Sequence, residues 1–222
     1  MSGVSGLRNR SGRAGDDRSG QSRLVGSDGE THQGLFDLSF LNMIPNMTIL
    51  SPKNRWEMAD MVRFCADFQY PVALRYPRGA AYEGLSAFRT PIVYGKSEIL
   101  YEEEDIAVIF VGHMAELAVQ VRDRLKEIGY HCSLINARFV KPLDTELLDR
   151  LSQNHSLLVT VEENVKSGGF GEHVSAYMEA CHPEIRVLSA AVWDRFVPQG
   201  KCRKPAQPDW TWSGRHQTGN RR

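Results

Sequence analysis

The chain has 222 residues, of which 41% are apolar and 24% charged, as in an ordinary globular protein of one large or two small domains. Its formal net charge is zero, so no overall electrostatic field indicates binding to nucleic acid or to an anionic membrane. Residues 1–30 lack the apolar core of a secretory signal, and the longest strongly apolar run, 106–111, is far too short to span a bilayer.

The two ends of the chain differ in composition from its body. In residues 1–23, 15 are Gly, Ser or Arg, and such a segment lacks the apolar surface to form a core. Residues 201–222 carry six Lys or Arg against one Asp and show no regular apolar pattern. Both ends are therefore predicted to be disordered. The four cysteines are far apart and form no C-x-x-C pair, which favours a reducing compartment and predicts a cytoplasmic protein.

Residues 24–88 show the pattern of part of an α/β domain. A loop-rich passage leads to a short strand, 47–50, and a second strand at 71–76 runs into a turn. A helix is predicted between them, because apolar residues recur there at a spacing of three or four. Asn54 is placed to cap this helix, with Glu57 in the capping-box position. The apolar face of the helix is formed by Met58, Met61, Val62, Cys65 and Phe68.

Residues 80–98 are predicted to form a linker with an edge hairpin, and a second domain is predicted for residues 92–200. Its nearly continuous apolar strands alternate with helices, which is typical of a parallel sheet covered on both faces. The predicted fold class is therefore α/β with a largely parallel sheet. The strands are 106–112, 132–140, 156–164 and 185–192. The first helix ends at Gly129, and its core-facing residues are Leu117, Ala118, Val121, Leu125 and Ile128.

The segment "GSDGETHQG", 26–34, places Asp28, Glu30 and His32 at alternate positions. In an extended chain these side chains project to one side and can converge. One interpretation is a metal site, because carboxylates and imidazole are ligands of several divalent ions. A second is a proton-transfer pair, in which a carboxylate fixes the tautomer of the imidazole. The third is an exposed loop with local Asx-turn hydrogen bonds.

Two other stretches place polar groups after predicted strands. "VALRYPRG" carries Arg75 and Arg78, whose guanidinium groups suit either a phosphorylated ligand or a surface ion pair. Glu162, Glu163 and Asn164 precede the turn "SGGFG" and a helix, where backbone amides can hold an anion. Because the glycine spacing matches neither nucleotide-binding fingerprint, a capping and interface role is the preferred interpretation of this stretch.

Four stretches in this order resemble the 1-deoxy-D-xylulose-5-phosphate synthases, thiamine-diphosphate enzymes of the transketolase superfamily. They are "GSDGETHQGLFDLSFLNMIPNMTILSPKN", "PVALRYPRG", "NARFVKPLD" and "VTVEENVKSGGFGE". The resemblance covers about residues 24–200, roughly four fifths of the chain. It implies a partial pyrimidine-binding domain at 24–88, followed by a transketolase C-terminal-like α/β domain at 92–200.

The resemblance also implies an activity and its residues. The family condenses pyruvate with glyceraldehyde 3-phosphate to 1-deoxy-D-xylulose 5-phosphate and CO₂, for isoprenoid, thiamine and pyridoxal synthesis, and a homodimer is expected for the complete enzyme. By resemblance, Asp28 and His32 are the catalytic acid and imidazole that assist proton transfer, and Arg78 binds the substrate phosphate. Glu30 matches no fixed carboxylate of the family, so no metal ligand is expected here.

The sequence also departs from the family. An apolar strand ending in Asp-Arg precedes "LVGSDG" in the family, and its arginine contacts phosphate; here Arg18 and Arg23 are both candidates for that role. The residues that bind thiamine diphosphate and Mg²⁺ belong to a more amino-terminal part of the family, with the glutamate that activates the cofactor. The cofactor-binding residues of this chain are therefore unknown, and the chain alone is expected neither to bind the cofactors nor to turn over substrate.

Three interpretations of what kind of polypeptide this chain is stay open. It is a fragment of the synthase, or the carboxy-terminal subunit of a split enzyme whose partner supplies the missing domain. The third is a non-catalytic dimerisation or interaction module, since the carboxy-terminal domain of the superfamily contributes dimer contacts.

Overall fold

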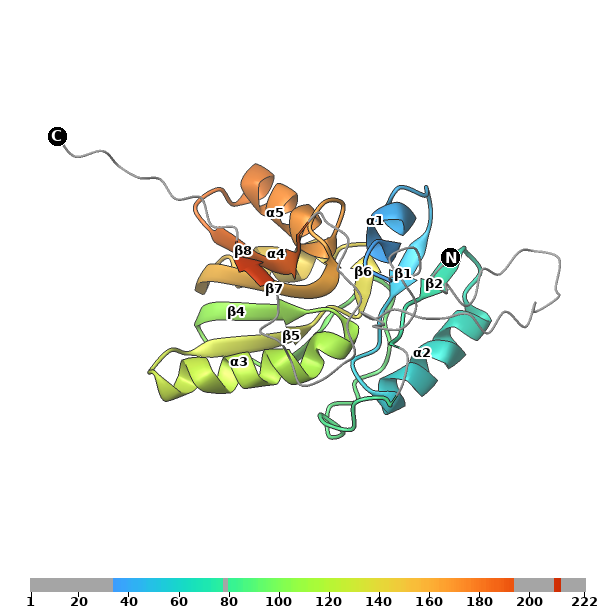
Figure 1. Cartoon of the computed structure of the whole chain (residues 1–222), viewed down its shortest axis with the longest axis horizontal. Coiled ribbons are helices and arrows are strands. Elements are labelled where there is room, and N and C mark those ends of the chain that lie inside the picture. The colour runs from blue at the N-terminus through green and yellow to red at the C-terminus, as the bar shows by residue number, and fades with distance from the viewer. Residues whose placement is uncertain (1–33, 78–79, 194–209, 213–222) are drawn as a thin grey trace.

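The structure is a computed structural model that describes residues 34–77, 80–193 and 210–212, shown in colour in Figure 1. The helices are α1 Asp37–Asn42, α2 Arg55–Asp67, α3 Ala115–Glu127, α4 Thr145–Leu151 and α5 Phe170–Cys181, with the 3₁₀ helix η2 at Gly112–Met114. The strands are β1 Thr48–Leu50, β2 Val72–Leu74, β3 Glu98–Tyr101, β4 Asp105–Phe110, β5 Cys132–Asn136, β6 Phe139–Lys141, β7 His155–Val165, β8 Arg186–Val192 and β9 Trp210–Trp212. Among these residues the strands form two sheets.

The larger sheet has the strand order β3-β5-β4-β7-β8-β9. Its four central strands are parallel, whereas β3 and β9 are antiparallel edge strands. Successive residues of β4 point to opposite faces: Val108 and Phe110 lie in one core cluster with α3, and Ala107 and Ile109 lie in the other with α4 and α5. Both faces are thus covered, and the predicted α/β class with a largely parallel sheet is confirmed (Figure 1).

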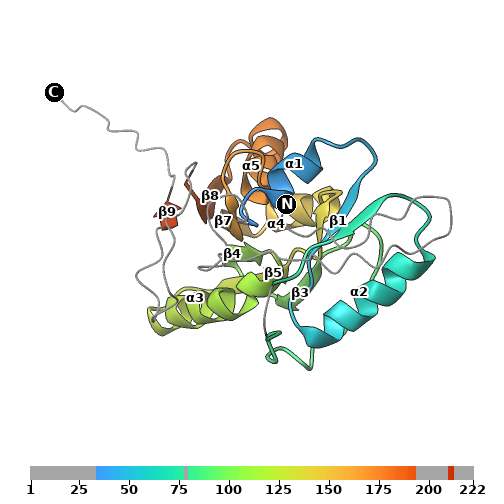
Figure 2. The same ribbon diagram turned by 45° about the vertical axis from the view of Figure 1, so that its right-hand side comes forward.

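The smaller sheet joins the two parts of the chain. It has the order β2-β1-β6, in which β1 and β2 come from the first part and β6 from the second. α2 covers one face, where Leu50, Met61 and Phe139 form a cluster. On the other face Ile49 is fully buried in the core of the larger sheet. The first part therefore shares its packing with the second, because Phe139 joins the cluster under α2 and Ile49 joins the core of the larger sheet. Figure 2 shows α2 and the small sheet beside the larger one.

The amino end of α2 was predicted correctly. Asn54 Oδ1 accepts a hydrogen bond from Glu57 N at 3.0 Å, and the Glu57 carboxylate accepts one from Lys53 N at 2.7 Å. The Glu57 side chain therefore reaches one residue beyond the cap, a variant of the predicted capping box. Met61 is fully buried as expected, but Val62 is 49% exposed. Likewise Ile128, predicted to face the core, is 59% exposed, because α3 ends before it.

Three other predictions were wrong in detail. The strand predicted at 132–140 divides into β5 and β6, because the chain turns between the two sheets at Ala137 and Arg138. The hairpin predicted at 80–98 is absent from the described residues, and β3 pairs with β5 instead. Within the tail predicted to be disordered, Trp210–Trp212 form β9 beside β8. Residues 1–23 lie outside the described residues.

Candidate functional site

The residues that the sequence assigns to catalysis and phosphate binding lie outside the described residues: Asp28, His32, Arg78 and the alternatives Arg18 and Arg23. The description begins at Gly34, two residues after His32, and includes Arg75, three residues before Arg78. Both of these neighbours lie in one polar interface between the first part of the chain and the second domain. That interface is the candidate site.

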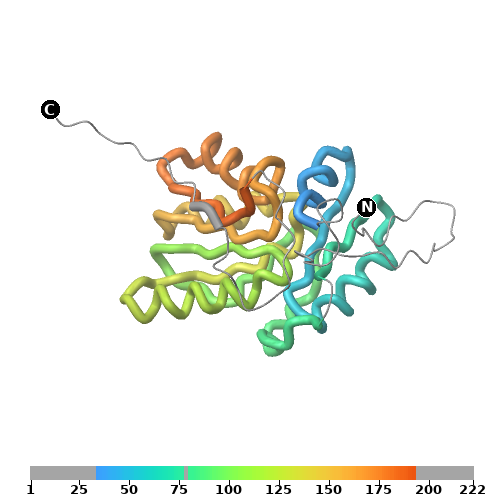
Figure 3. Tube along the Cα trace, viewed as in Figure 1, coloured from blue at the N-terminus to red at the C-terminus, as the bar shows by residue number. Residues whose placement is uncertain are grey.

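The interface contains a seam between residues 34–42 and residues 162–168. In Figure 3 the blue segment that begins the described chain runs beside the orange segment that holds the end of β7. The two segments are more than a hundred residues apart in sequence, yet backbone and side chains both connect them. The hydrogen bonds are Val165 N to Leu35 O at 2.8 Å, Leu38 N to Asn164 Oδ1 at 3.2 Å, Ser39 Oγ to Ser167 O at 2.6 Å and Asn42 Nδ2 to Gly168 O at 3.1 Å.

The seam explains why α1 exists. Its cap residue, Phe36, makes no side-chain capping bond, so the six-residue helix has no local N-terminal signal. Asn164, which is fully buried on β7, supplies the acceptor for Leu38 N and donates through Nδ2 to Ser39 Oγ at 2.8 Å. A tertiary contact thus replaces the missing cap, and the preferred interface role for Asn164 agrees with this geometry.

Glu162 lies at the amino end of α5, where the sequence indicates that backbone amides can hold an anion. Its carboxylate accepts hydrogen bonds from Phe170 N at 2.8 Å and Gly171 N at 2.7 Å, at the amino end of α5. Burial raises the pKa of Glu162 to about 7, although both amide bonds favour the charged form. The group that accepts from these amides is therefore a carboxyl side chain of the protein, in agreement with the capping interpretation.

Arg75 lies at the centre of the interface, 4% exposed. Its Nη2 donates to Gly34 O at 2.9 Å and to Glu163 O at 2.7 Å, so one nitrogen holds both sides of the seam. Burial lowers the pKa of Arg75, while the carboxylates of Glu163, Asp37 and Glu162 oppose that shift. The phosphate role left open for Arg75 is thus replaced by contacts with backbone oxygens. The side chain of Glu163 lies beside His113, whose Nε2 is 2.8 Å from Glu163 Oε2.

A second polar cluster lies deeper between the two parts. Lys53 Nζ binds Glu57 Oε1 at 2.9 Å and Glu98 Oε2 at 2.5 Å. Arg138 Nε binds Glu57 Oε1 at 2.7 Å, and its Nη2 binds Glu98 Oε1 at 2.8 Å. Asn136 Nδ2 also donates to Glu57, at 2.9 Å. Two cations and two carboxylates therefore balance, with side chains at most 3% exposed. We call this group the buried charge network.

The sequence alone did not predict the buried charge network. A signal was present, because Asn136 and Arg138 interrupt the apolar stretch "CSLINARFV", where an unpaired polar group would be costly. Their partners were not recognisable, since Glu57 and Glu98 come from a helix and an edge strand far away in sequence. Only the fold brings the four charges together.

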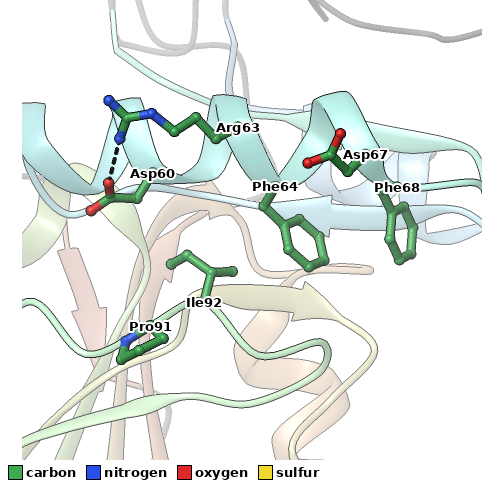
Figure 4. A pocket seen from close by; sticks show the side chains of 7 residues that line it. All are labelled: Asp60, Arg63, Phe64, Asp67, Phe68, Pro91 and Ile92. Atoms are coloured by element: carbon green, nitrogen blue, oxygen red, sulfur yellow. Dashed lines mark hydrogen bonds and ion pairs between the residues drawn. The ribbon is translucent and has the colours of Figure 1, made fainter.

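The structure also contains an open pocket of about 440 Å³ between α2 and the segment around Ile92. Figure 4 shows Phe64 and Phe68 above Ile92, with the Arg63–Asp60 hydrogen bond of 2.8 Å at one end. The pocket shares no residue with the seam, and Arg63, its one cationic residue, is paired with Asp60. We therefore do not assign the candidate site to this pocket. Its lining residues are Asp60, Arg63, Phe64, Asp67, Phe68, Pro91 and Ile92.

In the described part of the chain, no group of three or more His, Cys, Asp or Glu side chains could hold a metal ion. The one buried arginine near the seam is directed at backbone carbonyls. Over the same described ranges, no helix is long and apolar enough to cross a bilayer.

Comparison with protein families gives two matches in chain order. Residues 21–83 match the family described as "Transketolase, pyrimidine binding domain", and residues 95–206 match "Transketolase, C-terminal domain". The second match spans half of the chain. The two matched regions follow the two parts that meet at the seam.

Several curated relatives carry the same name. A protein of Lachnoclostridium phytofermentans named "1-deoxy-D-xylulose-5-phosphate synthase" is 48% identical over 185 residues, which are 83% of this chain and 29% of the relative. A protein of the same name from Clostridium perfringens is 42% identical over 186 residues, 83% of this chain and 30% of the relative. The chain thus spans less than a third of the length of these relatives.

Two solved structures are similar. One is titled "Split gene transketolase, inactive beta4 tetramer"; it has a TM-score of 0.70 and 27% identity, covering 75% of this chain and 55% of that chain. The other is a transketolase from Campylobacter jejuni, with a TM-score of 0.62 and 18% identity, covering 81% of this chain and 27% of that one. At that identity, the second likeness concerns the fold alone.

Proposed function

This chain belongs to the transketolase family, and from this premise we propose that it is the carboxy-terminal part of a 1-deoxy-D-xylulose-5-phosphate synthase. The reaction proposed for the complete enzyme is the decarboxylating condensation of pyruvate with glyceraldehyde 3-phosphate. The observation that carries this proposal is the 48% identity to a protein of that name, over a match that spans 83% of the chain. The product would feed isoprenoid, thiamine and pyridoxal synthesis.

Within that reaction we assign three residues of this chain. His32 transfers protons at the substrate, and Asp28 fixes the tautomer of its imidazole and raises its basicity. Arg78 binds the phosphate of glyceraldehyde 3-phosphate through its guanidinium fork. The proposal is supported by the chemistry of these side chains and by the firm attachment of the neighbouring Gly34 and Arg75 to the second domain.

We further propose that the chain acts only with an amino-terminal polypeptide. The chain spans less than a third of the length of these curated relatives, which supports this proposal. The similar structure titled as a split gene transketolase, an inactive tetramer of one chain type, supports this division of labour. The cofactors are accordingly assigned to the assembled enzyme, as a homodimer of complete units. Its proposed compartment is the cytoplasm, which the free thiols of Cys132 and Cys181 support.

The test is reconstitution. The chain is mixed with the upstream portion of the Lachnoclostridium relative, pyruvate, glyceraldehyde 3-phosphate, thiamine diphosphate and Mg²⁺, and 1-deoxy-D-xylulose 5-phosphate is measured. We expect turnover by the mixture and none by either polypeptide alone. Association without turnover would contradict the catalytic proposal, and turnover by the chain alone would contradict the need for a partner.

A histidine pair makes this test specific. His32→Ala is expected to lower turnover by the mixture at least about a hundredfold without weakening association. His131→Ala is the matched control, because the His131 side chain is 71% exposed and is not one of the proposed catalytic residues. Its neighbour is Glu103, whose Oε2 lies 3.7 Å from His131 Nδ1. A non-catalytic interaction module predicts that both variants behave like the unmodified chain.

A further inference from the structure

Arg75 uses its guanidinium group in an unusual way for a buried charge. Nη2 of the side chain donates to both Gly34 O and Glu163 O, whereas Nε and Nη1 have no hydrogen-bond partner among the described residues. Its backbone is fixed as well, because Arg75 N donates to Leu50 O at 2.8 Å and Arg75 O accepts from Ser51 Oγ at 3.0 Å. The arginine therefore links three segments at one point.

The surroundings favour a cation at this place. Glu163 and Asp37 contribute negative charge at Arg75, and Glu162 adds to it when ionised. A buried arginine that met only backbone oxygens would be costly, and these carboxylates offset that cost. Lysine would keep the charge, but its ammonium is a compact charge on a flexible stem, whereas the guanidinium group is planar and rigid. Because both bonds come from one nitrogen of Arg75, lysine is expected to replace the arginine only in part.

The position of Gly34 gives this link a functional meaning. Gly34 follows His32 by two residues. Since a chain extends by at most about 3.6 Å per residue, an anchor at Gly34 restrains the place from which His32 acts. We propose that Arg75 is a positioning residue, which holds the Gly34 end of the His32 segment against the Glu163 carbonyl of β7. This inference rests on the proposed function for its catalytic consequence, but the link itself is independent of that function.

The link is tested on the chain alone by hydrogen exchange of single amides. Val165 N, which bonds Leu35 O, and Leu38 N, which bonds Asn164 Oδ1, report on the seam. Loss of two hydrogen bonds from a charged donor is expected to speed their exchange about tenfold or more in Arg75→Met, and less in Arg75→Lys. Amides of β4 report on the core and are expected to change much less.

The matched control for exchange is Arg124→Met. The Arg124 side chain is 75% exposed, and its Nη1 lies 2.5 Å from Glu127 Oε2. Both residues lie outside the seam, so Arg124→Met should leave the seam intact. Equal acceleration of β4 and seam amides in Arg75→Met would overturn the proposal, because it would show general destabilisation. Unchanged seam amides would overturn it as well.

The catalytic consequence is tested in the reconstituted mixture. Arg75→Met is expected to lower kcat at least about tenfold, with KM for glyceraldehyde 3-phosphate within about threefold, since it displaces a catalytic group and removes no substrate contact. Arg75→Lys should recover part of kcat. In the double variant with His32→Ala, the Arg75→Met change should have no further effect on residual turnover, because both act through the same imidazole.

The outcomes separate the two proposals. A wild-type kcat in Arg75→Met, with the seam loosened, would overturn the positioning role. Additive losses in the double variant would also overturn it, because they would show that Arg75 acts apart from His32. If the unmodified mixture shows no turnover, the proposed function fails, while amide exchange in the chain alone still decides whether Arg75 holds the seam.

Discussion

Arg138 is the cation on which both carboxylates of the buried charge network depend. It binds Glu57 at 2.7 Å and Glu98 at 2.8 Å, and it donates to the carbonyls of Pro91 at 3.0 Å and Thr90 at 2.8 Å. Arg138→Met keeps most of the volume but leaves two carboxylates with one cation, Lys53, in a site where side chains are at most 3% exposed. Breaking a buried pair in this way costs about 3–5 kcal/mol of unfolding free energy.

The assay is unfolding of the chain by heat and by urea. For a protein of this size each kcal/mol lowers Tm by about 2–4 °C, so the expected loss is roughly 6–20 °C. Arg55→Met is the control, because the Arg55–Glu83 pair is 59% and 69% exposed and its loss should cost at most about 1 kcal/mol. If Arg138→Met lowers the free energy of unfolding by an amount within about 1 kcal/mol of the loss in Arg55→Met, the reasoning is refuted. The network would then not be a buried group whose charges depend on one another.

Two more stability predictions follow from single residues. Burial raises the pKa of Glu162 from 4.5 to about 7, so between these pH values the folded chain holds a proton that the unfolded chain releases. The free energy of unfolding should therefore fall by about 3 kcal/mol from pH 4.5 to pH 7 and stay constant above pH 7. Glu162→Gln should abolish this fall, as measured by urea titrations at several pH values. An unaltered pH profile would contradict this. Gly112→Ala should cost at least about 1 kcal/mol more than Gly129→Ala: both glycines have positive φ, but a Cβ at Gly112 would lie 2.1 Å from Ser51 Oγ, whereas Gly129 has open space. Equal losses in Tm would show that Ser51 moves freely.

Local patterns in the sequence were sufficient to predict the four parallel strands of the larger sheet, but not its edge strands β3 and β9. Apolar runs such as "IAVIFV" specify strands buried on both faces, and Asn54 marks the start of α2 by a bond to a residue three positions away. The division between β5 and β6 was missed, because apolar residues lie on both sides of Asn136 and Arg138 and the break serves the second sheet. α1 was missed for a related reason: its cap is Asn164, which is distant in sequence.

The candidate site was predictable to a different extent. Glu162 and Asn164 were recognised as capping and interface residues, because carboxylates and amides before a helix have few other partners. Arg75 was considered together with Arg78 as a phosphate ligand, since a guanidinium group suits phosphate and carbonyl oxygens alike. Which acceptor it meets depends on where Gly34 and Glu163 lie in the fold. The roles of Asp28, His32 and Arg78 stay predictions that concern residues outside the described part.

The central claim is that this chain carries only part of a cofactor-dependent site. Isothermal titration of thiamine diphosphate with Mg²⁺ tests it directly, first into the chain alone and then into its mixture with the upstream portion of the Lachnoclostridium relative, with that portion alone as the reference. The account predicts no heat of binding for the chain alone and saturable, Mg²⁺-dependent binding for the mixture, tighter than for the reference. Saturable binding to the chain alone would contradict it.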